Sequence, residues 1–278
     1  MDWQHILYSV DDGVAHVVLN RPEKLNALGL GRGSNRQELV DALELADSDD
    51  SVGAILVSAA GRAFCAGGDL VGVVPAENAY EHHLFIEQLA ASNARVRAIH
   101  KPIVAAVHGM CLGSGLGLLA QFDFVIAADD CRFGLIEGRI GHPGATEIVP
   151  IVGPAWAKFL MLTGEIIGAA RAEKIGLVLT TEPADVLIER CTELARRLAR
   201  MPREGTGLNK ATINGVADAM GRTAGTAVGR VHDVVTRDMS RLAKSPDGRL
   251  FDEILRDGGM EAMKAARDQQ FQGPWLDR

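Results

Sequence analysis

Cysteine is scarce in this sequence of 278 residues, which contains only Cys65, Cys111, Cys131 and Cys191, and no two of them form a CxxC pair. This spacing argues against a disulfide scaffold and against a zinc knot. Long apolar runs are also missing, since none approaches the ~18 residues of a membrane span. Residues 1–4 lack the basic and apolar segments of a signal peptide. We therefore expect a cytoplasmic protein with no membrane partner.

An excess of positive charge is absent as well, because 29 Lys and Arg residues are outnumbered by 36 Asp and Glu residues, for a formal net charge of -7. Nucleic-acid binding needs a concentrated basic surface, so we expect no nucleic-acid partner. Apolar residues make up 47% of the chain and charged residues 23%, which is the composition of an ordinary globular protein.

Hydrophobic periodicity predicts a mixed α/β chain. We predict strands at residues 6–10, 14–18, 52–57, 103–107 and 124–128, and helices at 35–47, 80–99, 154–162, 169–175 and 184–200. Beyond residue 202 the pattern indicates only helical segments, broken near residues 221 and 245–246. The predicted domains are a β-rich core, residues 1–200, and a helical region, residues 201–278.

The helical region carries one apolar stripe. Val231, Val234, Val235, Met239 and Leu242 recur at helical spacings on a segment that has no strand of its own to cover. Such a stripe must pack on the core, on a neighbouring helix of the same region, or on another subunit.

Two glycine-rich segments follow predicted strands and are candidates for ligand binding. In residues 62–69, the paired Gly67 and Gly68 let the backbone approach a ligand closely. Residues 113–117 (GSGLG) open a helix, where free N–H groups form a site for an anion or an oxyanion. A dinucleotide-binding loop is an alternative, although its spacing is G-x-G-x-x-G and the spacing here is G-x-G-x-G. A turn that serves packing alone is the third interpretation.

Four blocks of sequence, taken together, carry a family resemblance: residues 20–28 (NRPEKLNAL), 63–69 (AFCAGGD), 101–109 (KPIVAAVHG) and 162–165 (LTGE). In this order and spacing they resemble the crotonase, or enoyl-CoA hydratase/isomerase, superfamily. The resemblance implies a spiral of ββα repeats with a helical C-terminal trimerisation region. It also implies an acyl-CoA thioester substrate and a homotrimer or dimer of trimers. No separate cofactor and no metal are expected, because coenzyme A enters as part of the substrate.

The resemblance assigns catalytic roles to a few positions. The backbone N–H groups of Gly68 and Ser114 match the two oxyanion-hole donors of the family, and Glu137 matches the second of the two glutamates that hydratases use. The first glutamate falls on Gly117, which has no side chain. Apolar neighbours of Glu137 would raise its pKa toward the working range of a general base. An ion pair of Glu137 with Arg139 or with another cation is the alternative.

Two residues could replace the missing glutamate. His142 would serve as a second acid/base or as a hydrogen-bond partner. Glu147 would enter the site from the segment 141–147, which is shorter than is usual in the family. Cys65 and Cys111 flank the predicted oxyanion hole, and we interpret them as small apolar filler rather than as nucleophiles.

Residues for binding CoA also follow from the resemblance, namely Arg21, Lys24, Arg62, Ala63, Ala66 and Phe271. The three basic residues would contact the phosphates, and each could equally be a solvated surface charge. Phe271 matches an aromatic residue of the family that reaches a neighbouring subunit's CoA site, and Gln272 stands where many members carry Lys.

One carboxylate in place of two favours proton transfer between carbons over the addition of water. We therefore expect an isomerase-like acyl-CoA enzyme in which Glu137 moves the proton. Hydration is the alternative if His142 or Glu147 supplies a second acid/base. A catalytically weak acyl-CoA-binding or assembly protein and a dinucleotide oxidoreductase are the alternatives from other functional classes.

Overall fold

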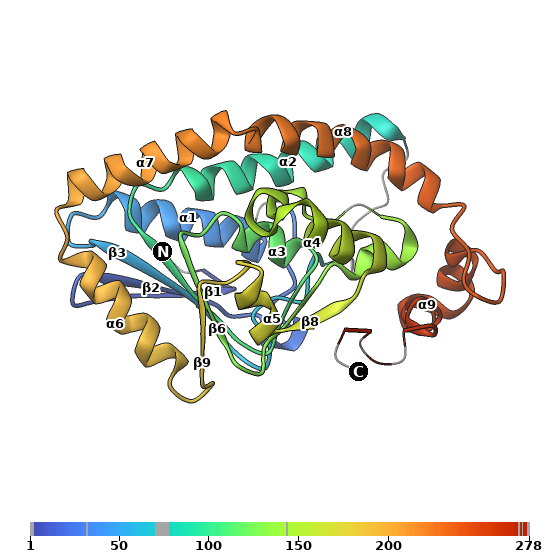
Figure 1. The fold of residues 1–278 in the computed structure, drawn as a ribbon, viewed down its shortest axis with the longest axis horizontal. Coiled ribbons are helices and arrows are strands. Elements are labelled where there is room, and N and C mark those ends of the chain that lie inside the picture. Colours follow the sequence, from blue (N-terminus) through green and yellow to red (C-terminus); the bar gives the residue numbers. More distant parts are fainter. Residues whose placement is uncertain are drawn as a thin grey trace.

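The computed structural model describes residues 3–31, 33–69, 78–142, 144–271, 273 and 275–276. Its main sheet has the strand order β1-β2-β3-β4-β6-β9 (Figure 1). The strands are β1 (Ile6–Asp11), β2 (Val14–Leu19), β3 (Ala54–Ala59), β4 (Ile103–Val107), β6 (Phe124–Ala128) and β9 (Thr180–Glu182). Only the β1–β2 hairpin is antiparallel within this sheet. The mixed α/β architecture that we predicted is confirmed.

Burial explains why the inner strands read as continuous apolar runs. All five residues of β4 are buried, and so are the first five of β3. Strands of a parallel sheet are covered on both faces and therefore carry no polar alternation. Helix α1 (Asn35–Ser48) contacts β2, and α6 (Leu187–Ala199) contacts β3 and β4. The two helices lie on opposite sides of the sheet in Figure 1.

A second, smaller sheet has the order β5-β7-β8 and positions the glycine-rich loops. Its strands are β5 (Met110–Leu112), β7 (Arg132–Gly134) and β8 (Ile166–Gly168), with three residues each. Strands this short produce no periodic signal, so the sequence pattern did not predict them. The helices that follow them are α3 (Ser114–Leu119) and α5 (Ala169–Lys174).

Helix α4 (Val149–Thr163) is two helical pieces joined at a kink. Gly153 lies at the kink with φ of 75°, a conformation that glycine adopts without strain, and Pro154 opens the second piece. The helix predicted at 154–162 is therefore this second piece. The first piece, residues 149–152, was missed because a single turn is too short to show a helical period.

The C-terminal region is helical, as predicted, and consists of α7 (Arg203–Ala219), α8 (Arg222–Ser240) and α9 (Phe251–Asp268). Helix α8 packs on α2 (Ala79–Ala98), which in turn packs on α1. Helices α7 and α8 run along the upper edge of the molecule in Figure 1, and α9 lies at one end. Among the described helices, none is both long and apolar enough to cross a bilayer.

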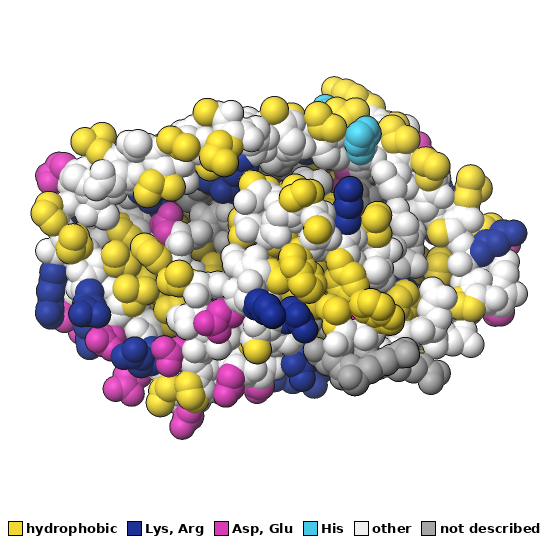
Figure 2. All heavy atoms as spheres, viewed as in Figure 1, with side chains coloured by type: hydrophobic (Ala, Val, Ile, Leu, Met, Phe, Trp, Pro, Cys, Tyr) yellow, Lys and Arg dark blue, Asp and Glu magenta, His cyan; other side chains and the backbone are white. Residues whose placement is uncertain are grey.

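The apolar stripe of α8 is not covered by this chain. Val231, Val235 and Met239 of α8 and Leu242 just after it are 55–74% exposed, whereas Val234 is partly buried. Leu208, Ile213 and Val216 of α7 and Met220 at its C-cap are exposed as well. Hydrophobic side chains gather along this edge in Figure 2. Of the three interpretations of the stripe, packing on the core and packing on a neighbouring helix are therefore wrong for these four residues.

Candidate functional site

The two glycine-rich segments meet, as an oxyanion hole requires. Cys65 and Cys111 form a parallel β-bridge, in which the Leu112 N–H donates to the Cys65 carbonyl at 2.9 Å. A Cβ atom placed on Gly68 would lie 3.3 Å from Ser114 Oγ. Loops that are far apart in the sequence thus bring the backbone of Gly68 next to the first residue of α3.

The N–H groups of Gly68 and Ser114 take no part in the hydrogen bonds that join these segments. In the bridge between Leu28 and Gly68, the bonds run from Leu28 N–H to Gly67 O and from Asp69 N–H to Leu28 O. The N–H of Gly68 is therefore not part of this bridge. Ser114 begins α3, where an N–H has no partner within the helix. Two such donors can hold the negative oxygen of a thioester enolate.

Glu137 lies directly against this loop. It belongs to the 3-10 helix η2 (Ile136–Ile140), which follows β7. A Cβ atom on Gly113 would be 3.3 Å from Glu137 Oε2 and 3.4 Å from Oε1, so glycine at position 113 allows the carboxylate to approach the residue before Ser114. Gly113 also has φ of 51°, which favours glycine.

Burial raises the pKa of Glu137 to about 7. Its own backbone N–H and the positive charge of Arg267 oppose this rise in pKa, whereas the negative charge of Asp233 adds to it. The alternative ion pair with Arg139 is wrong, because Arg139 Nη1 donates to Asp268 Oδ1 at 2.9 Å and its Nε donates to Gly164 O at 2.9 Å. A carboxyl with a pKa near neutrality is suited to general acid/base catalysis.

Glu147 occupies the space beside Gly117. It lies on the 3-10 helix η3 (Thr146–Ile148), and its Oε2 is 3.7 Å from the position of a Cβ atom on Gly117. Asn93 Nδ2 donates to Glu147 Oε1 at 3.1 Å, and the buried Arg36 donates to Asn93 Oδ1 at 3.3 Å. A carboxylate is therefore present beside the position of the family's first glutamate, although it comes from another segment.

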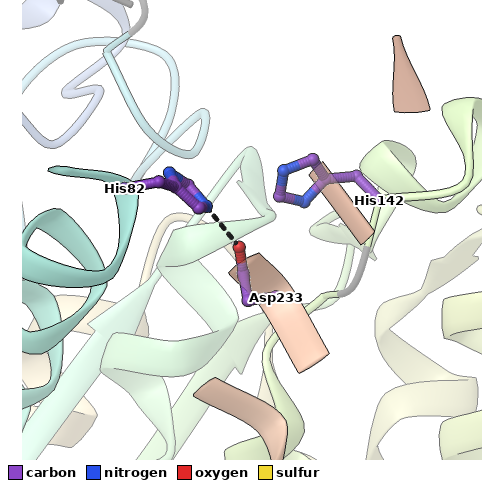
Figure 3. Close-up of side chains that lie close together, drawn as sticks. All are labelled: His82, His142 and Asp233. Carbon is purple, nitrogen blue, oxygen red and sulfur yellow. Dashed lines mark hydrogen bonds and ion pairs between the residues drawn. The ribbon is translucent and has the colours of Figure 1, made fainter. Parts of the chain in front are cut away.

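His142 lies elsewhere, in a group with His82 and Asp233 (Figure 3). Its backbone N–H donates to Glu137 O at 3.1 Å, which ties it to the turn that carries Glu137. Its ring faces His82 of α2 and Asp233 of α8. Of the two predicted substitutes for the missing glutamate, Glu147 is thus the one that lies beside Gly117. No local pattern predicts the pairing of His82 with Asp233, because the two residues are 151 positions apart in the chain.

The segment around Arg21 and Lys24 lies beside the segment that leads to Gly68. Lys24 belongs to the 3-10 helix η1 (Pro22–Lys24), and the Ala66 N–H donates to Leu25 O at 3.0 Å. Arg21 Nη1 is 2.6 Å from Asp69 Oδ2. Of the predicted CoA-binding residues, the structure brings together Arg21, Lys24, Ala63 and Ala66 in this region, and Arg62 lies exposed in the same loop as Ala63.

Asn26 connects these two segments, a role that we did not predict for it. Its side chain is fully buried and accepts a hydrogen bond from Arg21 N–H at 2.8 Å. It donates to Ala60 O at 2.9 Å and to Ala63 O at 2.8 Å. Its φ of 54° lies in the left-handed region, which Asn tolerates better than most residues.

Phe271 contacts Arg139 and, in the described part of the chain, makes no cation–π contact with Arg21, Lys24 or Arg62, the basic residues predicted to bind CoA. The guanidinium carbon of Arg139 is 4.1 Å from the centre of the Phe271 ring, which places this ring near η2 of its own chain. Gln272 lies outside the described residues.

The cysteines are built into the core. All four are buried and free, and burial raises the pKa of Cys65 to about 11 and that of Cys111 well above its ordinary value. A Cβ atom on Gly115 would lie 2.8 Å from Cys111 Sγ, so the glycine lets α3 pack on this thiol. These properties fit small apolar filler, as interpreted from the sequence, because the thiolate is the reactive form.

Comparison with known proteins agrees with this geometry. The family model described as enoyl-CoA hydratase/isomerase matches residues 9–239. A 1,2-epoxyphenylacetyl-CoA isomerase of Escherichia coli (strain K12) is 32% identical over 278 residues, covering 97% of this chain and 99% of the relative. A hydroxycinnamoyl-CoA hydratase-lyase of Pseudomonas fluorescens is 32% identical over 205 residues, covering 70% of this chain and 73% of the relative.

A solved structure of an enoyl-CoA hydratase/isomerase from Xanthobacter autotrophicus Py2 superimposes with a TM-score of 0.87 at 30% identity. The match covers 98% of this chain and 100% of the other. The predicted crotonase-type fold is thereby confirmed. Family model, relatives and fold agree, and the chain belongs to the enoyl-CoA hydratase/isomerase family of acyl-CoA enzymes.

Proposed function

We propose that this protein is an isomerase of enoyl-CoA thioesters in which Glu137 is the only proton carrier. The observation that carries the proposal is the position of the Glu137 carboxylate, against Gly113 and next to the N–H of Ser114, with a pKa of about 7. Position 117, where hydratases carry their other glutamate, is a glycine. The Escherichia coli relative is named an isomerase of an epoxyacyl-CoA, which supports isomerisation of an acyl-CoA thioester as the general reaction class.

The reaction needs only one carboxylate and two donors. With a 3-enoyl-CoA in the site, the Glu137 carboxylate removes a proton from the carbon next to the thioester carbonyl. The electron pair of that C–H bond moves into a dienolate, and the oxygen accepts hydrogen bonds from Gly68 and Ser114 N–H. The protonated Glu137 then returns the proton to the fourth carbon. The double bond ends up conjugated with the carbonyl, and the enzyme is regenerated.

Incubation with a panel of 3-enoyl- and 2-enoyl-CoA thioesters in deuterated water tests the proposal. Conversion of 3-enoyl to 2-enoyl thioesters is expected, with little 3-hydroxyacyl product by mass spectrometry. Tight CoA-thioester binding without turnover on any member of the panel would instead favour an acyl-CoA-binding or assembly protein. Binding of NAD without a response to acyl-CoA would favour the dinucleotide hypothesis.

Hydration is the second candidate, and the position of Glu147 favours it. Its carboxylate lies beside Gly117 and is held by Asn93, so Glu147 and Glu137 together would provide the two carboxylates between which hydratases hold water. One would take the proton of the water while the other protonates the carbon next to the carbonyl.

Glu147→Gln separates the two candidates. If Glu147 serves hydration, this substitution lowers the hydration rate of a 2-enoyl-CoA by about 10²–10⁴-fold, the usual contribution of a general base, while 3-enoyl isomerisation stays within about twofold. Both rates are measured on the same preparation by product analysis. The control is Glu204→Gln, which changes an exposed residue in the first turn of α7. Loss of both activities with Glu147→Gln would contradict the single-carboxylate isomerase.

We also propose that the chain assembles as a homotrimer or a dimer of trimers through the exposed apolar stripe. Val231, Val235 and Met239 are 60%, 55% and 64% exposed on one chain, and contact with another copy would remove them from water. Light scattering at micromolar concentration is expected to give the mass of three or six chains. Val231→Asp combined with Val235→Asp is expected to yield smaller species with unchanged helical content. A monomeric wild-type protein would contradict this assembly.

A further inference from the structure

The short 3-10 helix η2, which carries Glu137, has little hydrogen bonding of its own. The Gly138 N–H donates to Leu135 O at 3.0 Å, and the Gly141 N–H donates to Gly138 O at 3.0 Å. Hydrogen bonds in a 3-10 helix have poorer geometry than those in an α-helix, so a single such turn is only weakly stabilised by its own backbone. Contacts with other parts of the chain must therefore fix the direction of the Glu137 side chain.

Arg139, two positions after Glu137, connects η2 to two other elements. Its Nε donates to the carbonyl of Gly164, the C-cap of α4, at 2.9 Å, and its Nη1 donates to Asp268 Oδ1 on α9 at 2.9 Å. Its guanidinium carbon lies 4.1 Å from the centre of the Phe271 ring, and only 8% of its side chain is exposed. A planar guanidinium can donate in several directions and stack on a ring at once, whereas an ammonium cannot.

Two glycines allow η2 to lie directly on the end of α4. A Cβ atom on Gly138 would overlap the carbonyl oxygen of Met161, and a Cβ atom on Gly164 would lie 2.5 Å from Arg139 Cγ. Gly164 also has φ of 65°, a conformation that favours glycine. The stem of Arg139 therefore packs on the backbone of α4, while its guanidinium reaches α9.

Asp268 is an ionised partner for Arg139. Burial alone would raise the pKa of Asp268, but hydrogen bonds from Arg267 and Arg139 hold this pKa below its ordinary value. Arg267 donates from Nε to Asp268 Oδ1 and from Nη2 to Oδ2, each at 2.8 Å. The hydrogen bond from Arg139 to this carboxylate is charge-assisted, which makes it stronger than one between neutral groups.

The pKa of Glu137 reports how closely its turn is packed. Burial is the main cause of its rise to about 7. Among the described residues, Arg267 of α9 and Asp233 of α8 act on this pKa in opposite directions, and the rings of His82 and His142 lie near Asp233. A displacement of η2 that admits water would therefore lower the pKa of Glu137 even if every charge stayed the same.

We propose that Arg139 is a positioning residue, which holds the Glu137 carboxylate in place by fixing η2 between α4 and α9. Arg139 acts through Glu137 and has no step of its own in the proton transfer. The inference rests on the proposed function only in taking Glu137 as the base. A small displacement of a base from the reacting carbon slows proton transfer more than it weakens binding, because binding uses other contacts.

Two substitutions that conserve charge test this proposal without a substrate. Arg139→Lys keeps the positive charge but removes the planar donor, and Phe271→Leu removes the stacked ring. NMR titration of protein with isotope-labelled glutamate carboxyl groups measures the pKa of Glu137, whose signal is the one missing in Glu137→Gln. From about 7 in the wild type, this pKa is expected to fall in Arg139→Lys to about 6 or lower, toward the ordinary value of about 4.3. A smaller fall is expected for Phe271→Leu.

The rate of isomerisation provides the second measurement. Well above pH 7 the base is ionised in the wild type and in the variants, so a difference in kcat reflects its position. Arg139→Lys is expected to lower kcat for a 3-enoyl-CoA about tenfold, with KM within about twofold of the wild type. Arg256→Lys, at a 74% exposed side chain on α9, is the matched control and is expected to change neither kcat nor the pKa of Glu137.

Two results would overturn the inference. A pKa of Glu137 that stays near 7 in both variants, with native circular dichroism, would show that Arg139 does not hold the carboxylate. A lower free energy of unfolding with unchanged pKa and kcat would leave Arg139 with a structural role alone. If Arg139→Lys does not fold, the pKa measured in Phe271→Leu decides. Absence of isomerisation by the wild type would contradict the proposed function alone, because the titration uses no substrate.

Discussion

Replacing Glu137 with Gln is expected to lower the rate of 3-enoyl-CoA isomerisation by about 10²–10⁴-fold, the usual contribution of a general base. The amide has nearly the same shape but cannot accept the proton, so the affinity for CoA thioesters should change little. Stopped-flow measurement of the conjugated product gives kcat, and calorimetry gives the affinity. Glu189→Gln, at an exposed position in the first turn of α6, is the matched control.

The pH dependence of the same rate provides an independent check. The base must be ionised to remove a proton, and burial raises the pKa of Glu137 to about 7. The value of kcat/KM should therefore be nearly constant well above pH 7 and should fall about tenfold per pH unit below it. An ordinary carboxyl would show this fall near pH 4 to 5, at about its unperturbed pKa. Strong hydratase activity that Glu137→Gln leaves intact would show that another residue is the base.

Replacing Asn26 with Ala is expected to lower the free energy of unfolding by about 3–5 kcal/mol, because one buried and two partly buried backbone groups lose their partner. These groups are the N–H of Arg21 and the carbonyls of Ala60 and Ala63. Alanine also adopts the left-handed conformation of this position less readily than Asn. Chemical denaturation followed by circular dichroism measures the loss.

The loss of stability caused by Asn26→Ala should be specific to this buried position. Asn209→Ala, at an exposed position within α7, is the control, and it is expected to be neutral or slightly stabilising because Ala is the better helix former. A loss below about 1 kcal/mol for Asn26→Ala would mean that water or a shifted backbone satisfies the three groups. Because Ala63 leads to Gly68, a weakened oxyanion hole is expected together with the lower stability.

Hydrophobic patterns within single segments predicted the strands that are long enough to show such a pattern. The bounds predicted for residues 103–107 and 124–128 agree with β4 and β6, because strands buried on both faces are continuous apolar runs ended by polar or glycine residues. The three-residue strands β5, β7 and β8 are too short to have a period. They form because the backbones of segments distant in the chain pair with one another, and the residues of one segment do not indicate its partner.

The same limit applies to the site. Gly68, Ser114 and Glu137 lie in recognisable motifs, and the structure places all three together. Glu147 and His142 were both possible replacements for the glutamate absent at position 117, and the sequence could not choose between them, because the path of the segment 141–147 decides which side chain faces Gly117. The pairing of His82 with Asp233 depends on how α8 crosses α2, a tertiary contact without a local signature.

The contact of Arg139 with Asp268 has a consequence for the order of events in folding. Arg139 lies on the turn that carries Glu137, and its partner is on the last helix, 129 residues away in the chain. Arg267, whose charge acts on Glu137, belongs to the same helix. Contacts of such long sequence separation form late, because a large loop must close first. Glu137 therefore acquires its final surroundings only when α9 docks, so the electrostatic environment of this carboxyl depends on α9 as well as on the sheet.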